Sequence, residues 1–281
     1  MLKIDAHQHF WLYDPKRDTW ITDDMSVLQK DYLPAQLEQI LKRHDIDGCV
    51  VVQSDQSIEE NWFQLKNAEA NPFIKGIVGW VDLCHENIEQ QLAEFKPYTK
   101  LKGFRHVLQG EKDRALMLKP EFVRGLHALH VNGYTYDLLV LPDQLKYVIE
   151  LVDSLPDQKF VIDHLAKPLI KKGQLTPWTD EMKTIAQSPN VYCKVSGMVT
   201  EADWANWKAS DFTPYLDVVF EAFGTERLMY GSDWPVCEVA GGYDRMLDLV
   251  KTYTANLSST QAEDFWGGTA VRFYGLNDIK E

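Results

Sequence analysis

Positive charge is scarce in this 281-residue sequence, which has 29 lysines and arginines against 42 aspartates and glutamates and a formal net charge of −13. Such a charge repels phosphate backbones and anionic lipid surfaces, so neither nucleic acid nor membrane is expected as a partner. No run of about twenty apolar residues occurs. The first residues enter a strand-like segment without the apolar core of a signal peptide, which predicts a cytoplasmic protein acting on a small molecule.

Cysteine is also rare, and its positions exclude a paired metal-binding motif. The four cysteines stand far apart, and three of them lie in or beside apolar runs typical of buried strands. We therefore predict reduced thiols in the core. They are Cys49, Cys84, Cys193 and Cys237.

Two common catalytic signatures are missing. No glycine-rich phosphate loop follows the first predicted strand, where residues 6–11 read AHQHFW. Ser232 lacks the G-x-S-x-G elbow of serine hydrolases, and no cysteine stands in a nucleophile signature. These absences argue against dinucleotide binding and against covalent catalysis.

Eight short β-rich runs recur along the chain, separated by segments with helical apolar spacing such as Leu145, Val148, Ile149 and Val152. Alternating strands and helices favour parallel strands, and eight such units predict an α/β fold, a (β/α)8 TIM barrel in a single domain spanning residues 1–281. A doubly wound open sheet is the alternative. The predicted strands are residues 3–7, 48–53, 74–81, 101–107, 133–139, 159–164, 191–195 and 227–231.

One loop is too long for a simple turn. Residues 15–31 are polar, contain Trp20 and follow the first strand. We predict that this segment forms a lid over the barrel mouth.

Three imidazoles and one carboxylate fall at the ends of predicted strands. His7 and His9 project to the same side because side chains alternate along a strand, His164 closes the sixth strand and Asp233 closes the last. Taken singly, they read as a chance pair, a rim histidine and a turn aspartate. In a parallel barrel, however, the carboxyl ends of all strands converge on one mouth. Together these groups can polarise a carbonyl and deprotonate water, which is the chemistry of hydrolysis.

Other polar and aromatic residues near strand ends are candidates for holding a substrate. Arginine and lysine side chains can orient substrate oxygens, or form salt bridges within the barrel instead. Tryptophan faces suit the apolar faces of sugars, with core packing as the alternative. The predicted substrate-binding residues are Arg105, His106, Lys194, Trp11, Tyr136 and Trp234.

Six segments together resemble the amidohydrolase-2 group of the amidohydrolase superfamily, which contains sugar lactonases. The resemblance covers nearly the whole chain, and it implies a (β/α)8 barrel that hydrolyses a lactone such as L-fuconolactone or L-rhamnonolactone. The segments are DAHQHFW at 5–11, GFRH at 103–106, IDHLAKP at 162–168, KVSG at 194–197, TEADW at 200–204 and MYGSDWP at 229–235.

The resemblance implies roles for the four strand-end residues. His7 and His9 match the first-strand pair, His164 the sixth-strand histidine and Asp233 the general base of the last strand. All four suit a single zinc ion, but related lactonases are understood to work without metal. The implied scheme therefore requires no cofactor. Asp233 takes a proton from water, the histidines hold the lactone carbonyl, and the ring alkoxide leaves and is reprotonated from the same site.

The chain also departs from the superfamily pattern. Arg105 and His106 replace the bridging lysine or glutamate of the fourth strand, and no histidine stands near Tyr136 and Asp137 on the fifth. A two-metal centre is therefore not expected. The opening histidine pair is interpreted as a carbonyl-polarising device, with one zinc or other divalent ion as the alternative.

Three other functions remain open. A dicarboxylate-lactone hydrolase should place several arginines at the mouth, where only Arg105 is well placed, so a neutral sugar-acid lactone is favoured. A zinc-dependent decarboxylase, known among more distant members, would lose its activity to a chelator. A noncatalytic carbohydrate-binding barrel would explain the acidic, tryptophan-rich composition. The sequence specifies neither the sugar nor the oligomeric state.

Overall fold

Eight parallel strands are hydrogen-bonded in chain order in the computed structural model, which describes residues 1–276. The first and last strands meet through backbone hydrogen bonds between His9 N–H and Trp234 O at 2.7 Å and between Asp233 N–H and His7 O at 2.8 Å, which closes the barrel. The predicted (β/α)8 barrel is confirmed. Its strands are β1 (Ile4–Gln8), β2 (Gly48–Val52), β3 (Ile74–Gly79), β4 (Leu101–His106), β5 (Thr135–Leu138), β6 (Phe160–Ile162), β7 (Val191–Val195) and β8 (Leu228–Tyr230).

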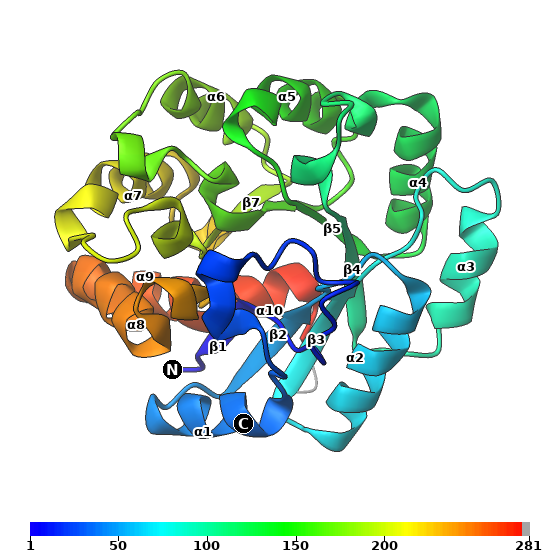
Figure 1. The fold of residues 1–281 in the computed structure, drawn as a ribbon. Helices are drawn as coiled ribbons and strands as arrows, with labels where there is room; N and C mark the ends of the chain where they lie inside the picture. Colours follow the sequence, from blue (N-terminus) through cyan, green and yellow to red (C-terminus); the bar gives the residue numbers. More distant parts are fainter. Residues whose placement is uncertain (277–281) are drawn as a thin grey trace.

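Helices connect the strands and surround them as an outer ring (Figure 1). The helix predicted from the spacing of Leu145 and Val148 is α5, which buries both residues against the barrel. The ring consists of α1 (Pro34–Arg43), α2 (Ile58–Ala70), α3 (Ile88–Phe95), α4 (Pro120–Val131), α5 (Leu145–Ser154), α6 (Trp178–Ile185), α7 (Ala209–Phe223) and α8 (Gly242–Tyr253).

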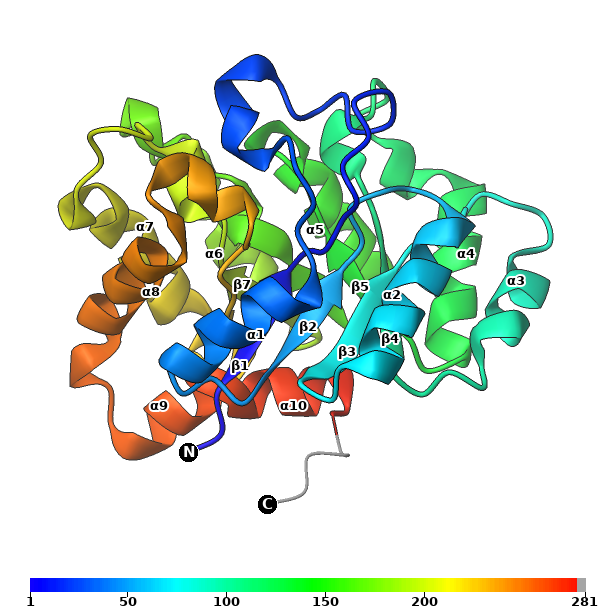
Figure 2. The same ribbon diagram turned by 60° about the horizontal axis from the view of Figure 1, so that its bottom comes forward.

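The last two described helices, α9 (Ser259–Glu263) and α10 (Thr269–Tyr274), lie beyond this ring. Figure 2 shows α10 running across the end of the barrel opposite the mouth. Its Phe273 and Tyr274 pack with Val50, Val78 and Val161 in one buried apolar cluster. Helix α10 therefore closes the bottom of the barrel.

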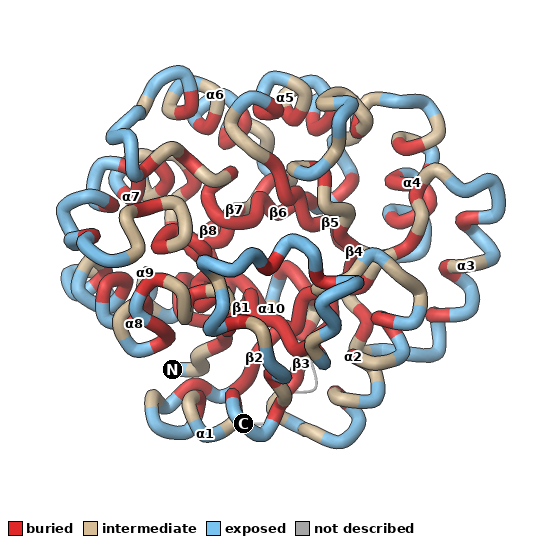
Figure 3. The backbone as a smooth tube through the Cα atoms, in the orientation of Figure 1, coloured by how far each residue is buried: buried red, intermediate tan, exposed pale blue. Residues whose placement is uncertain are grey.

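The pattern of buried residues follows the two layers of the fold, with strands inside and helices outside. Most strand residues are buried, and each ring helix buries one face against the strands while its other face is exposed (Figure 3). The larger apolar core lies between strands and helices, and a smaller one fills the lower barrel. The strands are rich in valine and isoleucine because both of their faces must be apolar over most of their length.

The predicted lid segment crosses the mouth (Figures 1 and 2). It is tied down at its base by the backbone pair Trp11 and Tyr32, with N···O distances of 2.9 and 3.0 Å, and by the buried side chain of Leu28. It contains one short 3₁₀ helix, Asp23–Leu28. The segment therefore covers the mouth as predicted.

The cysteines agree with the prediction of reduced thiols. All four are free, with Cys49, Cys193 and Cys237 buried and Cys84 partly buried. Among the described residues, none of the helices is both long enough and apolar enough to span a membrane.

Candidate active site

The three histidines and the aspartate predicted from the strand ends meet at the mouth of the barrel. The Nε2 atoms of His7 and His9 are 3.2 Å apart. Asp233 Oδ1 lies 3.3 Å from His9 Nε2, 3.9 Å from His7 Nε2 and 3.8 Å from His164 Nε2. All four residues are buried, so the cluster forms the floor of the mouth.

The opposite ring nitrogens of two histidines have fixed partners. His9 Nδ1 lies 2.8 Å from the carbonyl oxygen of Val52, and His164 Nδ1 lies 2.8 Å from Ser196 Oγ. A carbonyl oxygen only accepts hydrogen bonds, so Nδ1 of His9 carries a proton. Partners of this kind fix the ring orientation and direct the Nε2 lone pairs toward the cluster.

The third histidine rests on a buried ion cluster beneath the site. His7 Nδ1 lies 3.2 Å from both Asp163 Oδ1 and Lys194 Nζ. Lys194 also contacts Asp137 and lies 3.1 Å from Asp163, while Arg105 Nη1 lies 3.0 Å from the other oxygen of Asp163. The negative charges of Asp137 and Asp163 are thus neutralised by Lys194 and Arg105 in the barrel interior, where solvent screening is weak.

Burial sets the protonation of the floor. Desolvation holds the pKa of His7 and of His164 well below the usual value, so both rings are neutral at pH 7. Burial acts to raise the pKa of Asp233, but the imidazoles of His164 and His9 and the ammonium of Lys167 outweigh it, and the pKa lies below the usual range. At pH 7 the floor therefore presents the neutral imidazoles of His7 and His164 and the carboxylate anion of Asp233.

The low pKa of His164 predicts a pH-dependent stability in the chain stripped of metal by a chelator. Below pH 6.5 the unfolded histidine binds a proton that the native one does not, so the free energy of unfolding falls as the pH falls. The loss should grow as the pH falls from 7 to 5. His164→Asn should reduce the difference between urea unfolding at pH 7 and at pH 5.

The exposed His127 on α4 supplies the matched control for that measurement. His127→Asn should leave the pH dependence of the unfolding free energy as it is in the parent chain. A His164→Asn variant with the parent's pH dependence would contradict the argument.

The backbone leaves β6 in an unusual conformation. Four consecutive residues, 164–167, have φ between 51° and 56°, and Asp233 has φ of 58°. Left-handed backbone costs about 1 kcal/mol or more for each non-glycine residue. The strand predicted to reach His164 therefore ends at Ile162, because the chain turns there to aim His164 at the floor.

Two glycines make room for the histidines, and their role was not recognised from the sequence. A Cβ on Gly197 would lie 2.4 Å from His164 Nδ1, and one on Gly231 would lie 2.7 Å from His7 Cβ. Both distances are far below van der Waals contact. The glycines of the KVSG and MYGSDWP segments therefore make room for the rings of His164 and His7.

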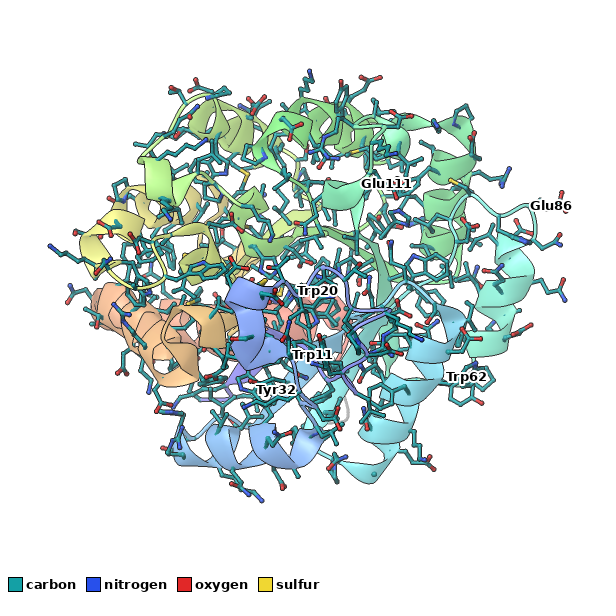
Figure 4. All side chains as sticks on the ribbon, in the orientation of Figure 1. Trp11, Trp20, Tyr32, Trp62, Glu86 and Glu111 are labelled. Atoms are coloured by element: carbon teal, nitrogen blue, oxygen red, sulfur yellow. The ribbon has the colours of Figure 1, made fainter. Side chains whose placement is uncertain are left out.

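A cavity of about 500 Å³ rises from the floor. Its polar side chains come from loops after several strands, and its apolar wall includes Trp20 from the lid and Trp204, whose ring nitrogen donates to Thr200 O. Figure 4 shows Trp20 above the mouth near Trp11 and Tyr32. The lining comprises His9, Trp20, Met25, Ser54, Asp55, Gln56, Arg105, Val107, Gln109, Leu139, His164, Lys167, Thr200, Glu201, Trp204, Asp233 and Val236.

Only one of the six predicted substrate-binding residues, Arg105, lines this cavity. Lys194 lies below the floor with no exposed side chain. On β4 and β5, side chains alternate, so the inward placement of Arg105 and Asp137 turns His106 and Tyr136 away from the cavity. The prediction of substrate contact is therefore revised for Lys194, His106 and Tyr136.

The two tryptophans in that prediction, Trp11 and Trp234, pack beneath the lid segment. Trp11 is 2 % exposed and donates from its ring nitrogen to Lys30 O at 2.9 Å. Trp234 is also 2 % exposed and packs edge-on against Phe10 and Tyr32. Neither lines the cavity, because both rings fill the space between the lid and the barrel.

Comparison with known proteins places the chain among close relatives. The amidohydrolase family model matches residues 4–276. An L-fucono-1,5-lactonase of Burkholderia multivorans is 39% identical over 98% of this chain and 96% of that protein, and one of Burkholderia ambifaria is 34% identical over 98% and 96%. A crystal structure of a Burkholderia multivorans amidohydrolase with bound zinc has a TM-score of 0.94 and 39% identity, covering 98% of this chain and 99% of that one.

Proposed function

This chain belongs to the amidohydrolase family, and on that premise we propose that it hydrolyses a sugar-acid lactone to the aldonic acid. The observation that carries the proposal is the floor of three imidazoles and one carboxylate under a cavity of about 500 Å³. The near full-length identity to L-fucono-1,5-lactonases supports the lactone as substrate, with L-fuconolactone and L-rhamnonolactone as the first candidates.

In the proposed reaction, each side chain has a role that follows from its charge. Asp233 is anionic and accepts the proton of the attacking water. His7, His9 and His164 face the point where the lactone carbonyl must lie, and Arg105 is the guanidinium on the cavity wall nearest to them. The aromatic faces of Trp20 and Trp204 suit the apolar face of a sugar ring.

Three of these side chains could hold one zinc ion, because the ligand atoms of His7, His164 and Asp233 all lie within 4.8 Å of one another. Asp233 Oδ1 lies 3.9 Å from His7 Nε2 and 3.8 Å from His164 Nε2, close to the separation of about 3.3 Å between the ligands of tetrahedral zinc. Neutral imidazoles with fixed Nδ1 partners and a carboxylate are an established zinc ligand set. A bound zinc ion would polarise the carbonyl and lower the pKa of bound water to about 7.

The low pKa of Asp233 favours a metal requirement, which the sequence left as the alternative. A carboxylate of low pKa is a weak base toward free water, whose pKa is about 15.7. We therefore expect exhaustive dialysis against a chelator to lower lactone hydrolysis at least about tenfold, and zinc to restore it. Metal analysis of the protein before and after dialysis is the independent readout. Full activity in metal-free protein would contradict this prediction.

The function itself is tested by a pH-indicator screen of aldonolactones, since hydrolysis releases one proton per lactone. Acid release from L-fuconolactone or L-rhamnonolactone is expected. A dicarboxylate lactone should react slowly, because Arg105 is the one arginine on the cavity wall among the described residues. Inactivity on every aldonolactone, with carbon dioxide released from an aromatic acid, would favour a decarboxylase instead.

A further inference from the structure

One cation on the cavity wall has no part in the scheme above. Lys167 lies three residues beyond His164 and lines the same cavity. We propose that the Lys167 ammonium is the general acid that protonates the ring oxygen as it leaves. This inference rests on the proposed lactone hydrolysis and names the residue that completes it.

The strained turn places Lys167 beside the floor. Residues 164–167 are all left-handed, and Lys167 N–H donates to His164 O at 2.8 Å, which closes a single turn. Residues three apart on one turn of helix project to the same side, as His164 and Lys167 do toward the cavity. A loop of ordinary backbone conformation could orient His164 by itself. Four consecutive left-handed residues are costly, and we explain them by the need to turn two side chains toward the substrate together.

The ammonium is held in place but remains available. Lys167 Nζ lies 3.2 Å from Glu201 Oε1, and the two side chains are 19% and 22% exposed at the cavity wall. Glu201 leaves two ammonium protons free for hydrogen bonds into the cavity, because an ammonium has three donors.

The other cations near the floor are poorly suited to donate a proton. Lys194 has no exposed side chain and is committed to Asp137 and Asp163. Arg105 is bound by Asp163 and by the carbonyl oxygen of Gln53, and a guanidinium does not give up its proton in proteins. Among the described residues that line the cavity, Lys167 is the one lysine.

The step balances in protons and electrons. The water oxygen forms a bond to the carbonyl carbon while Asp233 accepts one water proton. The bond between that carbon and the ring oxygen then breaks, its electron pair goes to the ring oxygen, and an Nζ proton of Lys167 moves to the same oxygen. An alkylammonium is a stronger acid than an alcohol by about five powers of ten, so the transfer is downhill. The protons left on Asp233 and on the new carboxyl group restore Lys167 and release one proton to solvent.

Three variants test the proposal on L-fuconolactone and L-rhamnonolactone. Lys167→Met should lower kcat at least about 100-fold, the usual contribution of general acid catalysis. Lys167→Arg keeps the positive charge but cannot donate a proton, so it should remain within about fivefold of Lys167→Met. Lys172→Met, at an exposed position beyond the same loop, is the matched control and should retain the wild-type rate. Circular dichroism and thermal unfolding check that each variant is folded.

The leaving group provides a second measurement. Dihydrocoumarin opens to a phenolate, whose conjugate acid has a pKa of about 10, so it needs little protonation to depart. Lys167→Met should therefore lose less than about tenfold on dihydrocoumarin while losing at least about 100-fold on the sugar lactone. If dihydrocoumarin does not fit the cavity, the comparison of Lys167→Arg with Lys167→Met on the sugar lactone tests proton donation by itself.

The outcomes separate the two proposals. A wild-type chain without activity on any aldonolactone overturns the proposed function and this inference with it. An active wild type with near-normal sugar-lactone turnover in Lys167→Arg overturns proton donation only. Equal losses on both lactones in Lys167→Met also overturn it, because a purely structural role would not distinguish the leaving groups.

Discussion

Asp233→Asn is expected to lower kcat for sugar-lactone hydrolysis at least about 1,000-fold while the chain keeps its fold. The amide preserves the shape of the carboxylate but cannot accept the proton of water, and it weakens the ligand set for a metal ion. Since Asp233 lies at the floor and not on the sugar-binding wall, lactone binding should survive. Steady-state kinetics and calorimetric titration with the lactone measure the two effects separately.

The control for this variant is Asp157→Asn. Asp157 is exposed in the turn between α5 and β6, at the end of the barrel opposite the mouth. This substitution makes the same chemical change and should leave kcat and the midpoint of thermal unfolding unchanged. Turnover in Asp233→Asn equal to that in Asp157→Asn would remove Asp233 from the role of base.

Lys194→Met is expected to cost about 3 to 5 kcal/mol in the free energy of unfolding. The substitution leaves Asp137 and Asp163 buried with Arg105 as their remaining cation. Burial already raises the pKa of Asp137 to about 6 beside the lysine, so without it this carboxyl should take up a proton. Urea unfolding at pH 7.5 measures the loss.

Two further variants show whether the loss comes from unpaired charge. Adding Asp137→Asn to Lys194→Met removes one of the two carboxylates and should recover part of the stability. Lys183→Met removes an exposed lysine that pairs with Glu221, and it should cost less than about 1 kcal/mol. A Lys194→Met variant no less stable than Lys183→Met would show that the buried cluster contributes nothing.

The barrel and the cluster of His7, His9, His164 and Asp233 could be predicted from the sequence because both depend on local patterns. Apolar runs mark the strands, and the parallel arrangement brings their ends together whatever the details of the loops. His7, His9, His164 and Asp233 therefore meet without any knowledge of side-chain packing. The ends of the strands were predicted less accurately. Strand β6 ends two residues before its predicted end, because the backbone enters a left-handed turn at His164.

The substrate-binding residues were harder to predict for a physical reason. A strand end places two neighbouring side chains on opposite faces, so an error of one residue exchanges Arg105 with His106, or Asp137 with Tyr136. Lys194 was expected at the cavity because the strand pattern does not show how deep in the barrel an inward-facing lysine lies. A lysine halfway down the barrel and a lysine at its mouth have the same sequence pattern. Lys167 and Glu201 were missed as a pair because they come from loops whose course the strand pattern does not predict.

Helix α10 is linked through side-chain contacts to the candidate active site at the other end of the barrel. The hydroxyl of Tyr274 donates to both oxygens of Asp137, at 3.1 and 2.9 Å, and Asp137 in turn holds the lysine that supports His7. Tyr274 and His7 are far apart in the sequence and lie at opposite ends of this chain of contacts. The position of His7 therefore depends on contacts that run the length of the barrel, from α10 at its bottom to the candidate site at its mouth.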